Sequence, residues 1–513
     1  MTLRSRAAPL ARATRARARR FKSFRYWKNA EGNQRVLPLR IYDPTTRDEL
    51  VAIVEQAQTD GLTVKAVGSH HAWSDAALTD GYVIETHGLH RFCEIEDARR
   101  STENLIRVQA GIRLRALNDE LLSNGKALLN MGGYDGQTLG GAISTSTHGS
   151  GVTFGPMSDF VVSLDVVASN GRCIRIEPED GITDRQKFEQ KRPEWQLVQN
   201  DEWFRSAQVS IGCFGIIYAA TIEVTSAYFL TERRRVHNWR ELEPQLSDRR
   251  VLDDVLRRHR HYEIYINPYP TTRQHDHVCL VTTRDKAEVA RRQHPPRGPR
   301  NRNALTEFGL RIPFVRRLIV FLFASWPKLG PRLLAIGLKN QANHDFTSDS
   351  FRVLNVGNAN LIPVICSEIS VPVDDEGTHV KAVRQLLKKA KLWRDQGGIY
   401  HAGYISLRFV RESPAFLSMM YGRPLTMAIE LFILHPIKGS EELLSAYEDA
   451  LSKLGGRPHW GQFNRIAGEH VTLAAMYSRF PVWLDVQRQL NSSGVFDSPM
   501  TKRVGFTSRG ALP

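Results

Sequence analysis

Two segments rich in small residues are the parts of this sequence best suited to contact phosphate groups. Residues 68–75 read Gly-Ser-His-His-Ala-Trp-Ser-Asp, and residues 140–151 read Gly-Gly-Ala-Ile-Ser-Thr-Ser-Thr-His-Gly-Ser-Gly. Small side chains let backbone N–H groups approach a phosphate closely, because little side-chain volume stands in the way. The first segment also carries a histidine at the tip of the turn. Together the two segments predict a bound dinucleotide and an enzyme that uses it.

Predicted strands and helices flank both segments and must position them. Thr46 and Glu49 have the spacing of a capping box, which predicts a helix that Gly61 ends. A strand over residues 63–67 leads into the first segment. We expect further strands over residues 82–85, 105–109, 160–169, 173–176 and 216–224, and a helix over residues 114–123. This alternation predicts one α+β domain before about residue 225.

The rest of the chain carries a second set of elements. The sequence predicts strands over residues 262–266, 364–371, 404–410 and 427–434, and helices over residues 377–394 and 440–454. With 513 residues, the chain is too long for one ordinary core, so we expect two domains.

The composition is that of a globular protein, with 42% hydrophobic and 24% charged residues. The 5 cysteines have no CxxC or zinc-type spacing, which argues for a reducing compartment and against a disulfide scaffold or a metal site. We expect no cleaved export signal and a cytoplasmic protein. Organelle targeting stays open, because the N-terminus is rich in arginine and free of acids.

The net charge of +16 raises nucleic acid or an anionic membrane as partners. Residues 4–28 contain no acid, and residues 291–317 contain only Glu307. We interpret these stretches as a disordered basic tail and a basic loop, because no nucleic-acid-binding motif accompanies them. Peripheral membrane contact through them stays open. The apolar run at residues 318–326 is about half the length of a membrane span. It is either a buried helix, the more common case, or a membrane-surface anchor.

Four motifs, in this order along the chain, resemble those of a known family. They are residues 67–81, residues 108–112 (Val-Gln-Ala-Gly-Ile), residues 139–151 and residues 457–461 (Arg-Pro-His-Trp-Gly). They are similar to the motifs of vanillyl-alcohol-oxidase-type flavoproteins, and most similar to the aldonolactone oxidase and alditol oxidase branch, which includes D-arabinono-1,4-lactone oxidases. The resemblance covers most of the chain after about residue 35 and is weakest between residues 226 and 350.

This resemblance implies an α+β fold with two large parts. One is a PCMH-type FAD-binding domain of two subdomains, and the other is a substrate (cap) domain with an antiparallel sheet flanked by helices. The implied boundaries are a basic disordered tail over 1–30, the FAD-binding domain over 31–225, the cap domain over 226–450, and a C-terminal segment over 451–513 that returns to the flavin site.

The resemblance also implies how FAD is held. His71 aligns with the histidine that carries a covalent bond to the flavin in this family. His70 stands where glycine is usual and Ala72 where serine is usual, so His70 is a competing candidate for this bond. The residues implied to bind FAD are Gly68, Ser69, His70, His71, Ser74, Gly132, Gly140, Gly141, Ser144, Thr147, His148, Gly149, Gly215 and Ile217.

Two glycine-containing segments carry more specific expectations. Gly132 falls where family dehydrogenases carry a bulkier residue that blocks oxygen, so glycine there predicts an oxidase that produces hydrogen peroxide. Residues 211–217 resemble the family segment that closes over the adenine. A glycine-rich turn before a buried strand explains them equally well.

The substrate side departs from the family pattern. The Glu-x-Arg pair of the family corresponds to Ser406 and Arg408, and the family's late lysine corresponds to Gln462. Serine and glutamine form only neutral hydrogen bonds, which predicts a substrate that is less polar than a sugar lactone, or differently charged. Alternative roles stay open for Arg408, as a salt-bridge partner of a carboxylate, and for His459, as a packing neighbour of Trp460.

The expected reaction is oxidation of a CH–OH group in a sugar lactone, polyol or related alcohol by hydride transfer to flavin N5. His459 and His401 are the candidate bases, because imidazole titrates near neutral pH. Arg408 would stabilise the developing oxyanion or the reduced flavin. The expected catalytic residues are Arg408, His459, His401, Ser406 and Gln462, with no metal.

The expected electron acceptor is O2. The alternative is a flavin dehydrogenase that uses another acceptor and a less polar alcohol. A second alternative, from a different class, is a protein whose basic tail binds membrane or nucleic acid and whose flavin is secondary. We expect no specific nucleic-acid partner, and the oligomeric state is not predicted.

Overall fold

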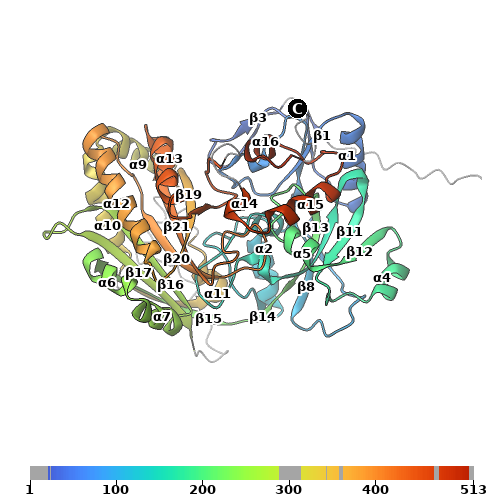
Figure 1. Ribbon diagram of the computed structural model, residues 1–513, viewed down its shortest axis with the longest axis horizontal. Helices are drawn as coiled ribbons and strands as arrows, with labels where there is room; N and C mark the ends of the chain where they lie inside the picture. The colour runs from blue at the N-terminus through green and yellow to red at the C-terminus, as the bar shows by residue number, and fades with distance from the viewer. Residues whose placement is uncertain are drawn as a thin grey trace, which may run out of the picture.

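The N-terminal half of the chain forms the domain that carries both small-residue segments (Figure 1). The computed structural model describes residues 21–23, 25–287, 313–342, 344–356, 362–466 and 473–507. Most of the predicted basic tail (residues 1–20) and most of the second basic stretch (residues 291–312) lie outside the described residues.

Two sheets build this N-terminal domain. The first has the strand order β1-β4-β6-β5, with β4, β6 and β5 parallel, and the second has the order β12-β11-β10-β13-β8-β7, with only β11 and β12 parallel. Their strands are β1 (Phe21–Lys22), β4 (Arg40–Tyr42), β5 (Val64–Val67), β6 (Tyr82–Glu85), β7 (Phe92–Cys93), β8 (Leu105–Gln109), β10 (Val161–Val167), β11 (Cys173–Glu177), β12 (Trp195–Gln199) and β13 (Ile216–Glu223). Two-stranded pairs are formed by β2 (Trp27–Lys28) with β3 (Arg35–Val36), and by β9 (Lys126–Ala127) with β14 (Thr225–Ser226).

The two helices predicted for this domain are present. Helix α1 (Arg47–Thr59) has the predicted capping box between Thr46 and Glu49, and helix α2 (Leu114–Ser123) has the predicted bounds. The domain also contains α4 (Arg185–Lys191) and α5 (Asp201–Ala207).

The second small-residue segment contains a short helix that the sequence did not predict. Helix α3 (Leu139–Ser144) begins after Thr138, whose hydroxyl accepts a hydrogen bond from the Gly141 amide at 3.4 Å. Two consecutive glycines disfavour a helix, but close packing requires one of them. A Cβ on Gly140 would lie 3.1 Å from the Cβ of Ala110.

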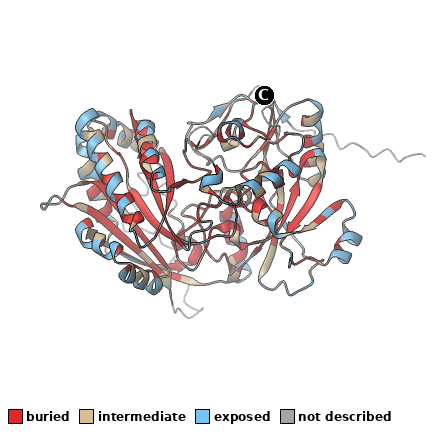
Figure 2. Cartoon of the chain, in the orientation of Figure 1, coloured by how far each residue is buried: buried red, intermediate tan, exposed pale blue. Residues whose placement is uncertain are grey.

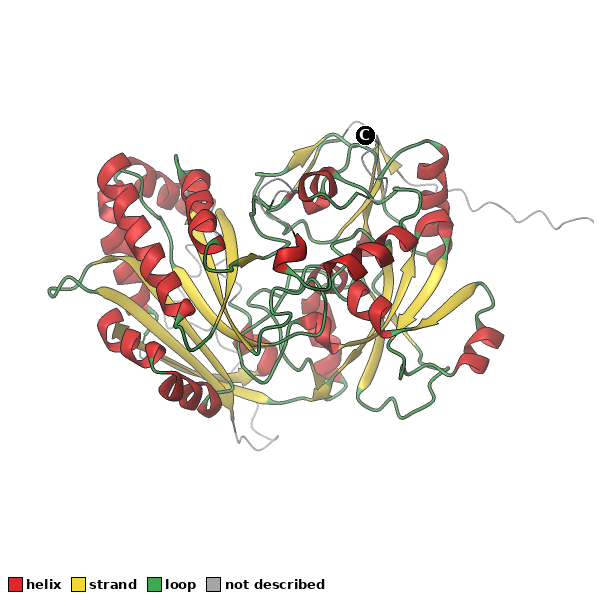
Figure 3. Cartoon of the chain, in the orientation of Figure 1, coloured by secondary structure: helices red, strands yellow, loops and turns green. Residues whose placement is uncertain are grey.

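The cap domain is one antiparallel sheet of eight strands, in the order β18-β15-β17-β16-β20-β21-β19-β22. Helices α6, α7, α12 and α13 pack against one face of it, as Figures 1 and 3 show. The strands are β15 (Phe229–Asn238), β16 (His261–Pro270), β17 (His277–Lys286), β18 (His344–Asp349), β19 (Val364–Pro372), β20 (Ile405–Arg411), β21 (Leu425–Leu434) and β22 (Arg457–Pro458). The helices are α6 (Trp239–Ser247), α7 (Arg249–Arg258), α11 (Ser350–Leu354), α12 (Thr378–Gly397) and α13 (Ser440–Ser452).

Helices α9 (Pro313–Ser325) and α10 (Gly330–Asn340) complete the cap domain. Helix α10 packs Ala335 and Leu338 against Val278 and Leu280 of β17. The predicted apolar run at residues 318–326 lies in and just after α9, and it is only partly buried, because several of its large side chains are exposed. Of the two alternatives for this run, the buried helix does not fit these exposed side chains, and the membrane-surface anchor stays a prediction.

The last described residues return to the N-terminal domain. They form α14 (Leu473–Met476), α15 (Phe480–Leu490) and α16 (Pro499–Val504), which lie across that domain in Figure 1. The Val64 amide of β5 donates to the Val495 carbonyl at 2.7 Å, and Val495 belongs to the core that β5 and β6 share with α1. Buried residues follow the strands of both domains in Figure 2. The cap sheet and its helices form one core cluster, whereas the main cluster of the N-terminal domain also includes cap-domain residues such as Val410 and Ala428.

Candidate active site

A cavity of about 1810 Å³ lies between the N-terminal domain and the cap domain. Its walls are the two small-residue segments, residues of β19, β20 and β21, and the inner sides of α9 and α10. Common small-molecule sites have roughly 300–1,000 Å³. This cavity therefore has room for a large cofactor together with a substrate.

The two small-residue segments pack against each other at one wall. A Cβ on Gly68 would lie 2.1 Å from the Thr138 hydroxyl, so only glycine permits this contact. Ser69 lines the cavity, and its buried hydroxyl has no hydrogen-bond partner in the structure. A buried, unpartnered hydroxyl is costly unless a ligand satisfies it. A polar ligand such as a dinucleotide fits this wall.

Most residues expected to bind FAD line the cavity. These are Gly68, Ser69, His70, His71, Gly132, Gly140, Gly141, Ser144, Thr147, His148, Gly215 and Ile217. Ser74 and Gly149 do not line it. The Ser74 hydroxyl instead donates to the Trp460 carbonyl at 2.7 Å, which joins the first segment to the late motif. Gly149 instead packs against the Met131 carbonyl. A Cβ on Gly149 would lie 2.4 Å from that carbonyl oxygen.

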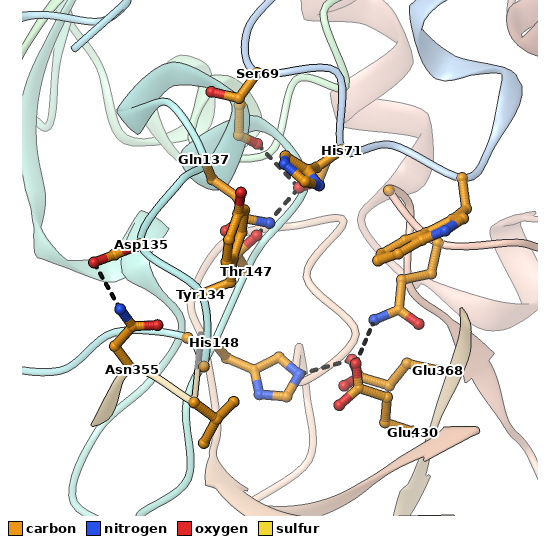
Figure 4. A pocket seen from close by; sticks show the side chains of 18 of the residues that line it. Ser69, His71, Tyr134, Asp135, Gln137, Thr147, His148, Asn355, Glu368 and Glu430 are labelled. Atoms are coloured by element: carbon orange, nitrogen blue, oxygen red, sulfur yellow. Dashed lines mark hydrogen bonds and ion pairs between the residues drawn. The ribbon is translucent and has the colours of Figure 1, made fainter. Parts of the chain in front are cut away.

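The two neighbouring histidines have different surroundings. The His71 ring packs edge-on against Tyr134, with 4.5 Å between ring centroids, as Figure 4 shows. Burial, together with the nearby His70 and Arg113, lowers the pKa of His71 to about 4. His71 is therefore neutral near pH 7. His70 has a positive φ of 62° and stacks on Trp27, with 5.4 Å between centroids.

A cluster of charged side chains lies at the cap-domain wall. Arg408 of β20 lies beside three glutamates that the sheet register brings to it. Its Nε donates to Glu263 Oε1 at 2.7 Å, and its Nη1 lies 2.7 Å from Glu430 Oε2 and 3.7 Å from Glu368 Oε2. Arg408, Glu368 and Glu430 line the cavity, whereas Glu263 does not. The salt-bridge alternative for Arg408 is therefore correct, and Arg408 also faces the cavity.

The position of Glu430 corrects the prediction for Ser406. Ser406 is fully buried and does not line the cavity. Glu430 of β21 lies directly opposite it in the sheet and accepts a hydrogen bond from Gln462 Nε2 at 3.2 Å. The carboxylate that is missing at position 406 is thus supplied by the neighbouring strand. The prediction of a less polar or differently charged substrate, which was based on Ser406 and Gln462, did not take this carboxylate into account.

The two glutamates that face the cavity, Glu430 and Glu368, differ in their pKa. The pKa of Glu430 lies above its ordinary value. Burial is the largest cause and raises this pKa, the positive charge of Arg408 lowers it, and the negative charge of Glu368 raises it. Glu368 is also buried, but His148 and then His459 and Arg408 lower its pKa to about 2. Glu430 is therefore the carboxylate of this cluster whose proton affinity is increased.

His148 forms an ion pair with Glu368, with 2.8 Å between Nε2 and Oε1 (Figure 4). Its Nδ1 contacts the Gly149 carbonyl at 2.8 Å, so both ring nitrogens donate in the protonated form. Burial alone would lower the pKa of His148, but the Glu368 carboxylate raises it above its ordinary value. His148 thus brings a positive charge to the cavity.

Neither histidine that was expected to act as a base has the right surroundings. His401 is fully buried and outside the cavity lining, where Nε2 contacts the Phe432 carbonyl at 3.0 Å and Nδ1 contacts the Tyr447 hydroxyl at 3.1 Å. His459 lines the cavity, but its Nδ1 accepts from the Gly461 amide at 3.0 Å. The proton of neutral His459 therefore resides on Nε2, and burial lowers its pKa to about 4. His459 is a hydrogen-bond donor to the cavity rather than a base.

Sequence reasoning missed Glu430 and Glu368, although a signal was present. Each is a lone glutamate inside an apolar strand: Glu368 in β19 and Glu430 in β21. A buried carboxylate needs a partner, so such residues indicate an internal charged site. Tyr134 and Asp135 were also missed. Asp135 lines the cavity and accepts from Asn355 at 2.7 Å. Among the described residues, no group of histidine, cysteine and acidic side chains could hold a metal ion.

Two family models match the chain over most of its length. The model described as FAD binding domain matches residues 38–177, and the model described as D-arabinono-1,4-lactone oxidase matches residues 220–504. The chain belongs to the D-arabinono-1,4-lactone oxidase family. It is accordingly an FAD-dependent oxidoreductase, and the family and the cofactor were identified correctly from the sequence.

Two curated relatives are similar over nearly the whole chain, and a third over less than half of it. L-gulono-1,4-lactone dehydrogenase of Mycobacterium tuberculosis is 26% identical over 93% of this chain and 98% of that protein. L-gulonolactone oxidase of Scyliorhinus torazame is 24% identical over 90% of this chain and 93% of that protein. D-arabinono-1,4-lactone oxidase of Eremothecium gossypii is 32% identical over 42% of this chain and 37% of that protein.

The solved structure of cholesterol oxidase from B. sterolicum superposes with a TM-score of 0.75 at 14% identity, over 94% of this chain and 97% of that chain. This likeness shows the fold alone, and it agrees with the predicted α+β, PCMH-type fold with a cap domain.

Proposed function

We propose that this family member oxidises a CH–OH group of an aldonolactone or a similar polyhydroxy compound, with Glu430 as the base. The observation that carries the proposal is the position of Glu430. It lines the cavity, is held by Arg408 and Gln462, and has a raised pKa. A carboxylate with increased proton affinity is better matched to accept a proton near neutral pH.

The residues of the cap-domain wall have different roles in such a reaction. Bound FAD supplies the acceptor for the hydride that leaves the carbinol carbon. Glu430 takes the proton of the hydroxyl group, so that the C–H and O–H bonds break and a C=O bond forms. Arg408 and His148 bring positive charge to the place where negative charge develops on oxygen. His459 donates from Nε2 and orients the substrate.

The charged wall supports a polar substrate. Glu368, Arg408 and Glu430 together with Gln462 and His459 offer both donors and acceptors to several hydroxyl groups. The relatives that match most of the chain carry L-gulono-1,4-lactone or L-gulonolactone in their names. L-gulono-1,4-lactone and D-arabinono-1,4-lactone are therefore the compounds to test first.

We further propose that FAD is bonded covalently to His71 and that O2 reoxidises it. His71 is neutral and faces the cavity, whereas the ring of His70 is stacked on Trp27. Both features support His71 over His70 as the tether. For oxygen access, the supporting feature is Gly132, which lines the cavity and adds no side chain there.

The test combines anaerobic and aerobic measurements on the purified holoenzyme. Mixing with either lactone without oxygen should bleach the flavin absorbance, and admitting air should restore it with formation of hydrogen peroxide. Acid precipitation should leave yellow fluorescence in the protein pellet of the wild type and not of His71→Ala. A flavin that neither lactone bleaches would contradict the substrate proposal, and flavin released from the wild type would contradict the tether.

A second candidate is oxidation of a less polar alcohol with an acceptor other than O2. The observation that favours it is the wall formed by α9 and α10, where Ile319, Phe323, Leu333, Leu334 and Leu338 line the cavity. Comparing kcat/KM for the lactones with that for long-chain alcohols, with O2 and with a dye as acceptors, separates the two candidates.

A further inference from the structure

Helices α9 and α10 expose an unusual number of large apolar side chains to solvent. We call this surface the α9–α10 face. It comprises Phe314, Leu318, Phe321, Trp326, Leu329 and Ile336, with exposed fractions between 41% and 71%. Contiguous apolar surface of this kind marks an interaction site in a globular protein. Phe321 and Trp326 also contact each other edge-on, with 6.0 Å between ring centroids.

The charged residues within the two helices of this face all have one sign. Residues 313–340 contain no aspartate or glutamate. Arg317 and Lys328 are exposed on or next to α9, and Arg332 and Lys339 are exposed on α10. Exposed aromatic and aliphatic side chains combined with basic ones, and with no acid among them, are typical of segments that lie in the headgroup region of an anionic membrane.

The two helices are arranged to lie on a surface. Within the described part of the chain, no single helix is long and apolar enough to cross a membrane. Residues Phe314–Ser325 and Pro327–Asn340 meet that test only as a pair, and they are bent by 100°. The opposite sides of both helices line the cavity through Ile319, Phe323, Leu334 and Leu338. The cavity and the exposed apolar surface are thus separated by one layer of helix.

We propose that the α9–α10 face docks on an anionic lipid membrane. The apolar side chains enter the boundary between headgroups and acyl chains, and the four basic side chains contact lipid phosphates. Docking brings the apolar wall of the cavity next to the lipid, so that a lipid-soluble alcohol or electron acceptor reaches the site without crossing water. The proposal is independent of whether a lactone is the substrate.

The experiment measures co-sedimentation of the full-length FAD-loaded protein with vesicles. One set is phosphatidylcholine alone, and the other contains about 30% phosphatidylglycerol, which supplies the negative surface charge. We expect the wild type to bind to the anionic vesicles. The partition coefficient of Phe314→Ser/Phe321→Ser/Trp326→Ser should be lower by a factor of about ten or more. None of these three residues lines the cavity. The triple variant should therefore keep its flavin and its turnover of a water-soluble substrate.

A matched control removes two exposed apolar side chains elsewhere. Phe92 and Leu392 are 42% and 43% exposed, and Phe92→Ser/Leu392→Ser should bind vesicles as the wild type does. Raising NaCl to about 0.5 M shortens the Debye length to a few ångström and suppresses binding that is purely electrostatic, such as binding through the basic N-terminal segment. At this salt concentration, the wild type should still bind through the α9–α10 face, although more weakly. The triple variant should not bind.

Three results would overturn the proposal. The wild type could fail to bind anionic vesicles at any salt concentration. The triple variant could bind as tightly as the wild type, which would assign binding to the basic N-terminal segment. The wild type could bind no vesicles but form dimers that the triple variant does not form in sedimentation velocity, which would assign the face to a second copy of this chain.

Discussion

Replacing Glu430 with glutamine removes the proposed base while keeping the shape of the side chain. Glu430 lies 2.7 Å from Arg408 and accepts from Gln462 at 3.2 Å. The amide oxygen of glutamine can still accept one of these hydrogen bonds, and Arg408 keeps Glu263 as its other partner. The substitution therefore tests proton transfer more than the position of Arg408.

The expected loss follows from the role of the carboxylate. A positioned general base contributes about 10²–10⁴ in rate, which corresponds to roughly 3–5 kcal/mol in the barrier. We expect kcat for a lactone to fall by that factor in Glu430→Gln, with a much smaller change in KM. The wild-type kcat/KM should fall as the pH drops through the raised pKa of Glu430, because the protonated carboxyl cannot accept a proton. The variant should lack this dependence.

The assay is anaerobic stopped-flow reduction of the flavin across a pH series, which isolates the oxidation of substrate from the reaction with oxygen. Glu263→Gln is the matched control. It removes the same charge from the other side of Arg408, and Glu263 does not line the cavity. If Glu430→Gln reduced the flavin at the wild-type rate, or if Glu263→Gln were equally slow, proton transfer to Glu430 would be refuted.

Three other predictions concern oxygen access, the flavin wall and pH. Gly132→Ala adds a methyl group to the cavity wall, so aerobic reoxidation should slow by about tenfold while anaerobic reduction stays unchanged; equal reoxidation rates would contradict the role in oxygen access. Gly68→Ala places a Cβ 2.1 Å from the Thr138 hydroxyl and should lower stability by about 1–3 kcal/mol and reduce the flavin content of the purified protein, whereas Gly397→Ala, with its nearest contact at 3.6 Å, should do neither. Burial raises the pKa of Asp159 to about 7. The protonated Asp159 side chain therefore contributes to the free energy of unfolding at low pH, and this contribution is lost as the pH rises through 7. Asp159→Asn should therefore raise Tm relative to the wild type at about pH 8 and not at about pH 4, and equal shifts in thermal melts at both pH values would contradict this.

The flavin side of the site was predictable because it is encoded locally. The segment that contains Gly68 and His71 is continuous in the chain, and the order of four such segments identified the family. The helical start of the second segment was not predictable, because two consecutive glycines disfavour a helix and Gly140 packs closely against Ala110. That contact joins parts of the chain that are distant in the sequence.

The charged cluster on the substrate side could not be predicted fully, because its members depend on which strands are neighbours in the sheet. Arg408 was found from its motif, but its partners Glu263, Glu368 and Glu430 come from β16, β19 and β21. No local spacing indicates that β16 and β21 flank β20, or that β19 lies on the far side of β21. For the same reason the sequence could not place His401 outside the cavity, since its position depends on contacts with Phe432 and Tyr447.

The return of the chain after the cap domain has a consequence for biosynthesis. Strand β5, which leads into the flavin-contacting turn, takes a hydrogen-bond partner from Val495, and the turn itself is joined to Trp460 through Ser74 and to Arg503 through Asp75. Domains usually fold in the order in which the ribosome makes them. Here the first domain lacks part of its core until the whole cap has been synthesised. Flavin loading therefore follows translation of nearly the whole chain, and a nascent chain that stops within the cap leaves an incomplete flavin site for chaperones and proteases to recognise.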